Sequence, residues 1–349
     1  MLKFKLKEIS FSVEASIQKT QQWFEAHPKI QSRFEASVNG FDELILAVPS
    51  TLDEAYGIIP PWLYLLHEAD QELDSTITLI FSGMYKEALR TLRSFVELNL
   101  LGTLYFTTKD TDDFKSWLRG EKETPRCKQL VEDLVKKNPN IAKLEQIEWS
   151  VSLRILYKKL SQFVHTGGHG GSFQVLRDSN VHMFNERGVE FAVQEFMQAI
   201  KLVSAARIAC FPLAMCPLPL FEKFGFGGPA SGFFEDDQVD RISGIFKEDQ
   251  KYLQCIKDIA VSDEDINAIV DGILSMPSLS EAEILETLKY WLDTMGNATD
   301  REKLVQDLKD KENDVIIAIV KAIQRSFIKA SFPLLNECML GLREADPPA

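Results

Sequence analysis

Cysteine is sparse in this sequence, and its spacing excludes two common ways of stabilising a small domain. The five cysteines are an odd number, are scattered and include no Cys-x-x-Cys pair: Cys127, Cys210, Cys216, Cys255 and Cys338. Such a pattern indicates neither a disulfide framework nor a zinc ribbon. We therefore expect reduced thiols and a cytoplasmic protein.

Long apolar segments are also nearly absent. The N-terminus, MLKFKLKEISFSVEAS, alternates charged and apolar residues and lacks the apolar core of a secretion signal. One run at residues 202–221, LVSAARIACFPLAMCPLPLF, is about as long as a bilayer requires. It contains Arg207, which is costly at a membrane centre, and three prolines, which break a helix. We expect a buried helix followed by an irregular apolar segment, and no membrane contact.

No complete catalytic or cofactor motif is present, so the sequence predicts no cofactor. The glycines at residues 167–171 lack the Gly-Lys-Ser/Thr ending and following helix of a phosphate-binding loop. His165, His169 and His182 could supply three imidazoles to a metal, with Asp178 as a fourth ligand. A glycine loop separates His165 from His169, so such a site would not be preorganised. We predict no metal site.

Acidic residues concentrate toward the C-terminus. The net charge is -13, and residues 232–349 contribute -11 of it, with 13 basic against 24 acidic residues. A glycine-rich stretch lies where the charge changes. We predict a helical domain at 1–224, a linker at 225–237 and an acidic helical domain at 238–349 that contacts a protein partner. The net charge does not support RNA binding, and the 11 basic and 6 acidic residues at 115–160 read as a solvated face.

Helical periodicity covers most of the chain, and it predicts an all-α, multi-helix bundle. One unbroken core helix is expected from residue 74 or 75 to about 106, and others at 13–26 and 189–210. Thr124-Pro125 and Asn138-Pro139 are typical of helix starts, as are Ser262 with Asp265 and Ser280 with Glu283. Residues 2–7, LKFKLK, alternate with period two and predict a short edge strand, while 41–48 fit a helix or a strand.

The stretch at residues 149–172 combines an amphipathic helix with a glycine-rich loop. Its apolar stripe is predicted to contain Val151, Ile155, Leu156 and Leu160, followed by Phe163 and Val164. Tyr157, Ser161 and His165 follow at intervals of four and so share a side of the helix. Gly167 and Gly168 can end the helix, which places His165 in the last turn as a structural histidine beside free carbonyls.

A second polar pair lies on the long upstream helix. Arg93 and Glu97 are four residues apart, so they either form a solvated pair or turn inward to meet Tyr157, Ser161 or His165. The second alternative predicts a ligand pocket lined by Arg93, Glu97, Tyr157, Ser161 and His165.

These two helices, ALRTLRSFVELNLLGTLYF and LYKKLSQFVHTG, resemble the HEPN-like helical superfamily (higher eukaryote and prokaryote nucleotide-binding). The likeness is to an uncharacterised bacterial branch in which an Arg...Glu helix packs beside a Tyr-x-x-Leu-Ser-x-x-x-His helix. The motif falls on Arg93, Glu97, Tyr157, Leu160, Ser161 and His165, and the resemblance covers residues 75–209. It implies a helical fold, a homodimer and a toxin or phage-defence setting.

HEPN ribonucleases are metal-independent and use an Arg followed four to six residues later by His, with protons handled by His and phosphate charge by Arg. His165 lacks that Arg, and Lys159, six residues before it, has no guanidinium fork. Arg177 and His182 fit the spacing, with Asp178 after the Arg, although their residues favour an exposed turn. His165, Lys159, Arg177 and His182 are therefore the candidate catalytic residues.

The leading hypothesis is a cytoplasmic helical interaction or regulatory protein that lacks a complete nuclease motif at His165. One alternative is a metal-independent endoribonuclease. The other is a small-molecule or nucleotide sensor that uses the five-residue pocket.

Overall fold

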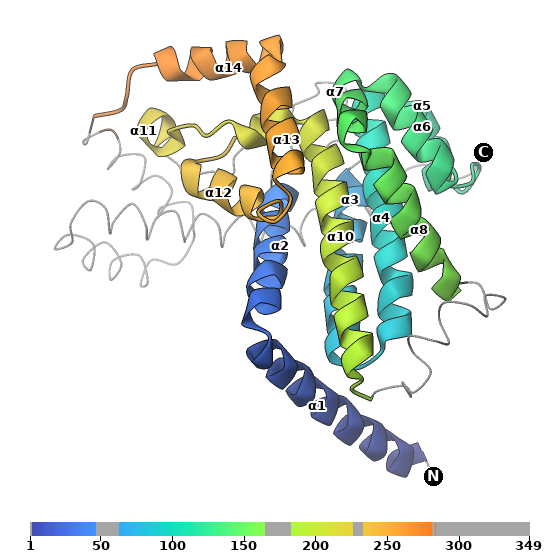
Figure 1. Ribbon diagram of the computed structural model, residues 1–349. Coiled ribbons are helices and arrows are strands. Elements are labelled where there is room, and N and C mark those ends of the chain that lie inside the picture. The colour runs from blue at the N-terminus through green and yellow to red at the C-terminus, as the bar shows by residue number, and fades with distance from the viewer. Residues whose placement is uncertain (1, 47–62, 165–182, 226–232, 281–282, 284–349) are drawn as a thin grey trace, which may run out of the picture. The chain divides into compact units, whose positions relative to one another are not determined.

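The computed structural model describes residues 2–46, 63–164, 183–225, 233–280 and 283. These residues form thirteen α-helices and two 3-10 helices, and their one β-type pairing is an isolated bridge between Pro217 and Phe234. The predicted all-α class is confirmed (Figure 1).

The chain divides into two compact units. The first contains residues 1–45, 52–211 and 241–259. Its helices are α1 (Leu2–Ala26), α2 (Pro28–Leu46), α3 (Leu63–Phe81), α4 (Tyr85–Thr108), α5 (Thr111–Leu118), α6 (Cys127–Lys137), α7 (Pro139–Lys143), η1 (Leu144–Ile147), α8 (Trp149–Val164) and α10 (Glu186–Cys210). It also holds the end of α12 (Asp236–Gly244) and most of α13 (Gln250–Ser262).

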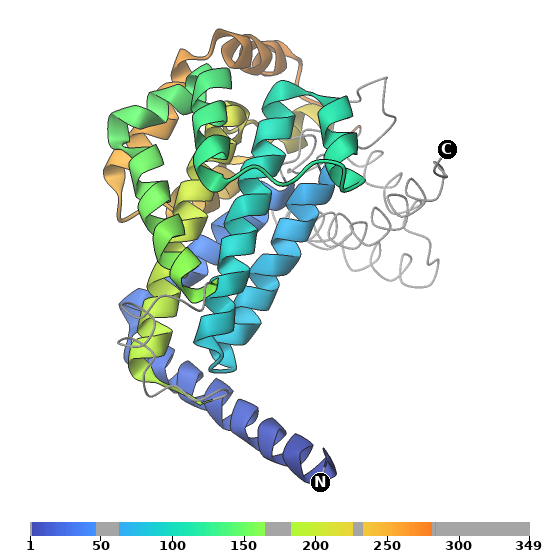
Figure 2. The ribbon, with the colours of Figure 1, turned by 90° about the vertical axis from the view of Figure 1, so that its right-hand side faces the viewer.

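Helix α4 is the centre of the first unit. It packs against α3, α6, α8 and α10, and Figure 2 shows α3 and α4 side by side, joined by a short turn. Its apolar side chains are removed from water along its whole length, including Ala88, Leu92, Phe95, Val96 and Leu100, each at most 1% exposed. Burial of this kind contributes about 1.5 to 3 kcal/mol for each large side chain.

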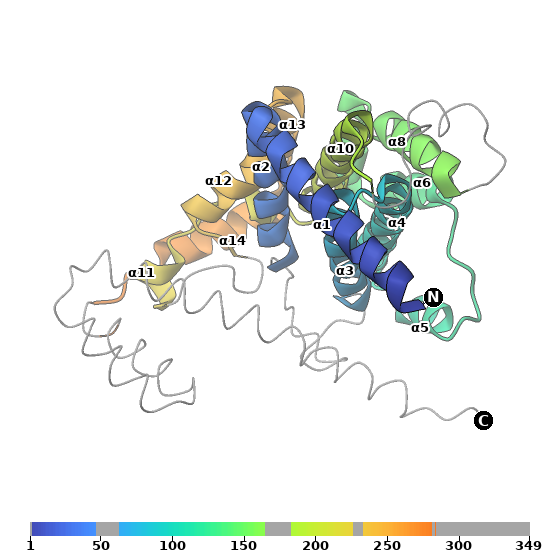
Figure 3. The same ribbon diagram turned by 90° about the horizontal axis from the view of Figure 1, so that it is seen from below.

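A turn at residues 82–84 separates α3 from α4, so the prediction of one unbroken helix across them is wrong. Gly83 adopts φ +74°, a left-handed conformation that favours glycine. A Cβ there would lie 2.4 Å from Ser16 Oγ of α1 and 2.8 Å from the Met183 carbonyl oxygen. Figure 3 shows α1 passing this end of the two helices. Both helices pack on one core, so the apolar stripe continues through the turn. This continuity is why the sequence pattern did not reveal the break.

The predicted N-terminal strand at residues 2–7 is wrong, because these residues open α1. A strand needs a partner for its backbone hydrogen bonds, whereas a helix satisfies them internally. No named strand exists among the described residues to pair with it. Residues 41–46, which fit either structure, belong to α2.

Of the two helix starts predicted from a proline, the one at Asn138-Pro139 is confirmed and the one at Thr124-Pro125 is not. The Asn138 side chain accepts from the backbone N–H of Asn140 and Ile141, with Pro139 at the first helical position, as predicted. The Thr124-Pro125 start is wrong, since α6 begins at Cys127. The Thr124 hydroxyl instead accepts from Trp117 Nε1 at 3.0 Å and ties the preceding loop to α5.

The predicted apolar stripe of α8 is partly wrong. Leu153, Leu156 and Leu160 are buried, but Val151 and Ile155 are 43% and 55% exposed. The buried stripe starts at Trp149, whose Nε1 donates to the Leu202 carbonyl at 2.9 Å, and this anchor sets the rotation of the helix. The start of α8 is capped by Glu145, which accepts from Ser150 N at 3.1 Å.

The apolar run at 202–221 is the buried end of α10, followed by η2 (Pro212–Met215) and an irregular segment, as predicted. Of the helices in the described ranges, none has the length and apolar character that crossing a bilayer requires.

The second unit contains residues 46–51, 212–240 and 260–349. Its described elements are η2, α11 (Leu220–Phe224), most of α12 and α14 (Glu264–Ser275). Leu218 N donates to Phe234 O at 2.8 Å, which joins the two sides of the glycine-rich stretch within this unit. The units thus divide the chain differently from the predicted limits at 224 and 238.

The predicted capping box of Ser280 with Glu283 is confirmed, because Ser280 N donates to Glu283 Oε2 at 2.7 Å and Glu283 N donates to Ser280 Oγ. The other predicted capping box paired Ser262 with Asp265. The helix cap lies one residue later, because the Asp263 side chain accepts from the backbone N–H of Ile266.

Gly188 provides a stability test. A Cβ at Gly188 would lie 2.4 Å from the ring of Tyr85, which is 1% exposed and cannot move aside. We expect Gly188→Ala to lower the free energy of unfolding by about 1 to 3 kcal/mol in denaturant titrations. In the control Gly272→Ala, no atom lies within 4 Å of the new Cβ, so this change should raise stability by about 0.5 to 1 kcal/mol. A stabilising Gly188→Ala would contradict the packing described for α10.

Candidate functional site

Three of the five predicted pocket residues meet where α4 faces α8. The Arg93 Nε and Nη2 atoms donate to the Tyr157 hydroxyl at 3.0 and 2.6 Å. Arg93 Nη2 also donates to Glu97 Oε1 at 3.0 Å, and the Tyr157 hydroxyl donates to the same carboxylate oxygen. The inward alternative is therefore correct, although Arg93 and Glu97 remain 20% and 27% exposed. We call these three residues the α4/α8 cluster.

The α4/α8 cluster changes the acidity of its members. Burial would lower the pKa of Arg93, but the Glu97 charge and the hydrogen bonds raise it, so the guanidinium stays charged. Burial and the bond to Glu97 raise the pKa of Tyr157 above its ordinary value of 10. Burial, assisted by the Glu97 charge, raises the pKa of the Cys127 thiol on α6 to about 12. Neither hydroxyl nor thiol gives up its proton at neutral pH.

The other candidates on α8 have partners of their own. The Ser161 hydroxyl donates to the Tyr157 backbone carbonyl at 2.7 Å, within the same helix. Lys159 Nζ, a candidate catalytic group, contacts Glu195 Oε1 of α10 at 2.7 Å, and the Glu195 side chain is only 6% exposed. The Lys159 charge is thus largely balanced by a buried carboxylate.

Sequence reasoning missed Arg90, which ties α4 to the last turn of α8. Its Nε donates to the Phe163 carbonyl at 2.7 Å, and its Nη1 contacts both Glu87 carboxylate oxygens at 2.9 Å. A cation at a helix C-terminus is a favourable arrangement. The i,i+3 spacing from Glu87 was readable in the sequence, but the contact with α8, 73 positions away, was not.

His165, Arg177 and His182 lie outside the described residues, as do His169 and Asp178. The catalytic roles assigned to them stay predictions. Within the described ranges, no three His, Cys, Asp or Glu side chains are grouped as a metal site requires.

No protein-family model, curated protein or solved structure matches the chain. The resemblance to the HEPN-like superfamily therefore stays a prediction carried by the motif residues alone.

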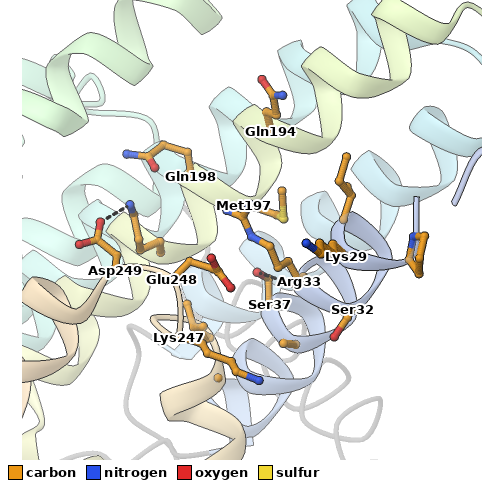
Figure 4. Close-up of a pocket in the computed structure, with 16 residues that line it drawn as sticks. Lys29, Ser32, Arg33, Ser37, Gln194, Met197, Gln198, Lys247, Glu248 and Asp249 are labelled. Atoms are coloured by element: carbon orange, nitrogen blue, oxygen red, sulfur yellow. Dashed lines mark hydrogen bonds and ion pairs between the residues drawn. The ribbon is translucent and has the colours of Figure 1, made fainter. Parts of the chain in front are cut away.

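A groove of about 880 Å³ lies elsewhere in the first unit. Its walls are α2 at residues 28–37, α10 at 194–201 and the segment at 244–249 (Figure 4). Lys201 Nζ of α10 pairs with Asp249 Oδ2 at 2.8 Å, which joins two of these walls. We call this site the α2/α10 groove.

Gly40 sets the close approach of α2 to the third wall. A Cβ at Gly40 would lie 2.5 Å from the Arg241 carbonyl oxygen and 2.6 Å from Ile245 Cγ1. Beside it, Arg241 Nε contacts Glu43 Oε1 at 2.6 Å. Lys29 and Arg33 share a face of α2 by their spacing, but no local signal linked them to α10 or to 244–249. The groove therefore could not be predicted from the sequence.

The α4/α8 cluster predicts a measurable coupling. Tyr157→Phe removes hydrogen bonds to two charged groups, so the free energy of unfolding should fall by about 1 to 2 kcal/mol. Combined with Glu97→Gln, the loss should differ from the sum of the single losses by at least about 0.5 kcal/mol. Glu121→Gln, in the exposed pair with Arg119, is the control and should leave stability unchanged. Additive losses would mean that the cluster does not act as a unit.

The pH dependence of stability at alkaline pH should test the raised pKa of the Tyr157 hydroxyl. An unfolded tyrosine loses its proton near pH 10, while folded Tyr157 keeps it to higher pH. The folded state then binds more protons, so the free energy of unfolding must fall as pH rises above the ordinary pKa. Tyr105 and Tyr252 have raised pKa values too and contribute equally in both proteins. Denaturant titrations between about pH 9 and pH 11 should show a shallower fall for Tyr157→Phe; equal slopes would contradict the assignment.

Proposed function

We propose that the protein is a helical interaction or regulatory protein in which the α4/α8 cluster is structural and not catalytic. One observation carries the proposal. The polar side chains of Arg93, Glu97 and Tyr157 bond one another, and Lys159 bonds Glu195. Each of these groups therefore has at least one charged or polar partner inside the bundle.

Acidity supports the same conclusion. A general acid or base works best when its pKa lies near the working pH and its reacting atom can reach the substrate. The pKa values of Tyr157 and Cys127 move away from neutrality, and Cys127 is 1% exposed. Perturbation in this direction fits packing between helices better than proton transfer.

The ribonuclease alternative needs a cation that can accept phosphate charge near His165. Two basic side chains at the last turns of α8 face a carboxylate: Lys159 of α8 contacts Glu195, and Arg90, which reaches α8 from α4, contacts Glu87. Those carboxylates would repel a phosphate. This alternative therefore rests on His165, Arg177 and His182.

The sensor alternative is weakened in a similar way, because Arg93, Glu97 and Tyr157 bond one another, so a ligand would have to compete with these bonds. The proposal also includes a cytoplasmic setting, which the four described free thiols support. A partner for the acidic C-terminal residues, a homodimer and a bacterial defence role are the remaining parts of the proposal and come from charge and resemblance.

An RNA cleavage assay tests the proposal. Purified protein would be incubated with a mixed RNA pool in chelator, beside His165→Ala, His182→Ala and Arg177→Gln. We expect no cleavage by any of the four proteins, because Lys159, the candidate catalytic cation of α8, is paired with Glu195.

Cleavage by the wild type that is lost in a histidine variant with an unchanged melting temperature would sink the proposal. That result would establish a metal-independent ribonuclease and name its histidine. Cleavage retained in every variant would point to a contaminating nuclease. Further chromatography would test this, because a contaminant's cleavage activity would elute separately from the protein.

A further inference from the structure

We propose that the α2/α10 groove binds a small organic anion, with a phosphate or carboxylate headgroup on an apolar body. The inference goes beyond the function proposed above, because none of the α4/α8 cluster residues lines this groove.

The charge of the groove is opposite to that of the whole chain. Its lining has four basic side chains, Lys29, Arg33, Lys201 and Lys247, and two acidic ones, Glu248 and Asp249. An excess of two positive charges stands out on a chain whose net charge is -13. A concave surface of one sign concentrates ligands of the other sign.

Internal pairing does not use up this charge. Asp249 is paired with Lys201, and the Lys201 ammonium also lies 4.9 Å from the centre of the Tyr252 ring. Among the described residues, no hydrogen bond or ion pair engages the side chains of Lys29, Arg33 or Lys247. Three cations therefore remain for a ligand.

The position of these cations suits an anionic headgroup. Lys29 and Arg33 are one turn apart in the first two turns of α2, so their side chains share one face of the helix. The guanidinium of Arg33 presents a planar fork that matches phosphate or carboxylate oxygens, and the Lys29 ammonium supplies a point charge beside it. In Figure 4 both side chains come from the same wall of the groove.

The rest of the lining suits an apolar body of small-molecule size. Ile30, Ala36, Met197 and Ile245 provide apolar surface between the polar groups. The volume of about 880 Å³ lies within the range of roughly 300 to 1,000 Å³ that small-molecule sites occupy. A partially apolar anion would satisfy both parts of the lining, whereas an inorganic ion would leave the apolar part exposed.

Glu248 gives the proposal a sharp test. Its side chain enters the groove from the wall opposite Arg33 (Figure 4). Within the part of the chain that the structure describes, no cation pairs with the Glu248 carboxylate, so a bound anion must tolerate this negative charge. Replacing Glu248 with glutamine removes the repulsion and should tighten anion binding, an effect that loss of structure cannot imitate.

Calorimetric titration of the full chain with three probes tests the ligand class. Phenyl phosphate, benzoate and benzyl alcohol share a ring and differ in headgroup charge. We expect both anions to bind at millimolar concentration or better, and the alcohol to bind at least tenfold more weakly, about the contribution of a charge-assisted hydrogen bond. Tighter binding of phenyl phosphate would identify a phosphate headgroup, and tighter binding of benzoate a carboxylate. Equal binding of the alcohol, or no binding of either anion, would overturn the proposal.

Variants locate the binding. Arg33→Gln and Lys29→Gln should each weaken binding of the preferred anion, Arg33→Gln by about tenfold, while Arg33→Lys should restore part of it. Lys136→Gln removes the same charge from α6, outside the groove, and is the matched control. Glu248→Gln should strengthen binding a few-fold. Unchanged affinity in Arg33→Gln and Lys29→Gln, with melting temperatures like the control, would place the ligand elsewhere and refute the inference.

Discussion

The first unit depends on one constraint, which is that α4 is enclosed by α3, α6, α8 and α10. A helix surrounded on this many sides must present apolar side chains over most of its circumference, and each polar group on it needs a partner. Thr103 and Thr107 meet this need by donating to carbonyls one turn back in α4 itself. Asn99 does the same through its amide nitrogen.

Longer polar side chains on α4 cannot turn back so easily, and they bond to neighbouring helices. Arg93 reaches Tyr157, and Arg90 reaches the Phe163 carbonyl, so two arginines on successive turns hold α8 against α4. Both arginines keep a glutamate on their own helix. The cluster that looks most like a site in the sequence is thus explained by the packing of α4.

Sequence reasoning predicted well what depends on spacing within a helix, and poorly what depends on how helices meet. The interval from Arg93 to Glu97 correctly placed them on one face, and the caps at Asn138 and Ser280 follow local rules. Val151 and Ile155 fit a helical stripe as well as Leu153 and Leu156 do, and only the anchoring of Trp149 on α10 decides between these two rotations. The break at Gly83 was hidden because glycine is also tolerated inside helices.

The close approach of α2 to the third wall of the groove at Gly40 has a consequence for folding during synthesis. Arg241 and Glu43, which meet there, are 198 positions apart in the chain. A ribosome therefore completes α2, α4, α8 and α10 well before it delivers the last wall of the α2/α10 groove. Contacts of such long range form late and at a large entropic cost. The bundle around α4 can assemble during synthesis, whereas the groove exists only once the chain has grown past residue 249.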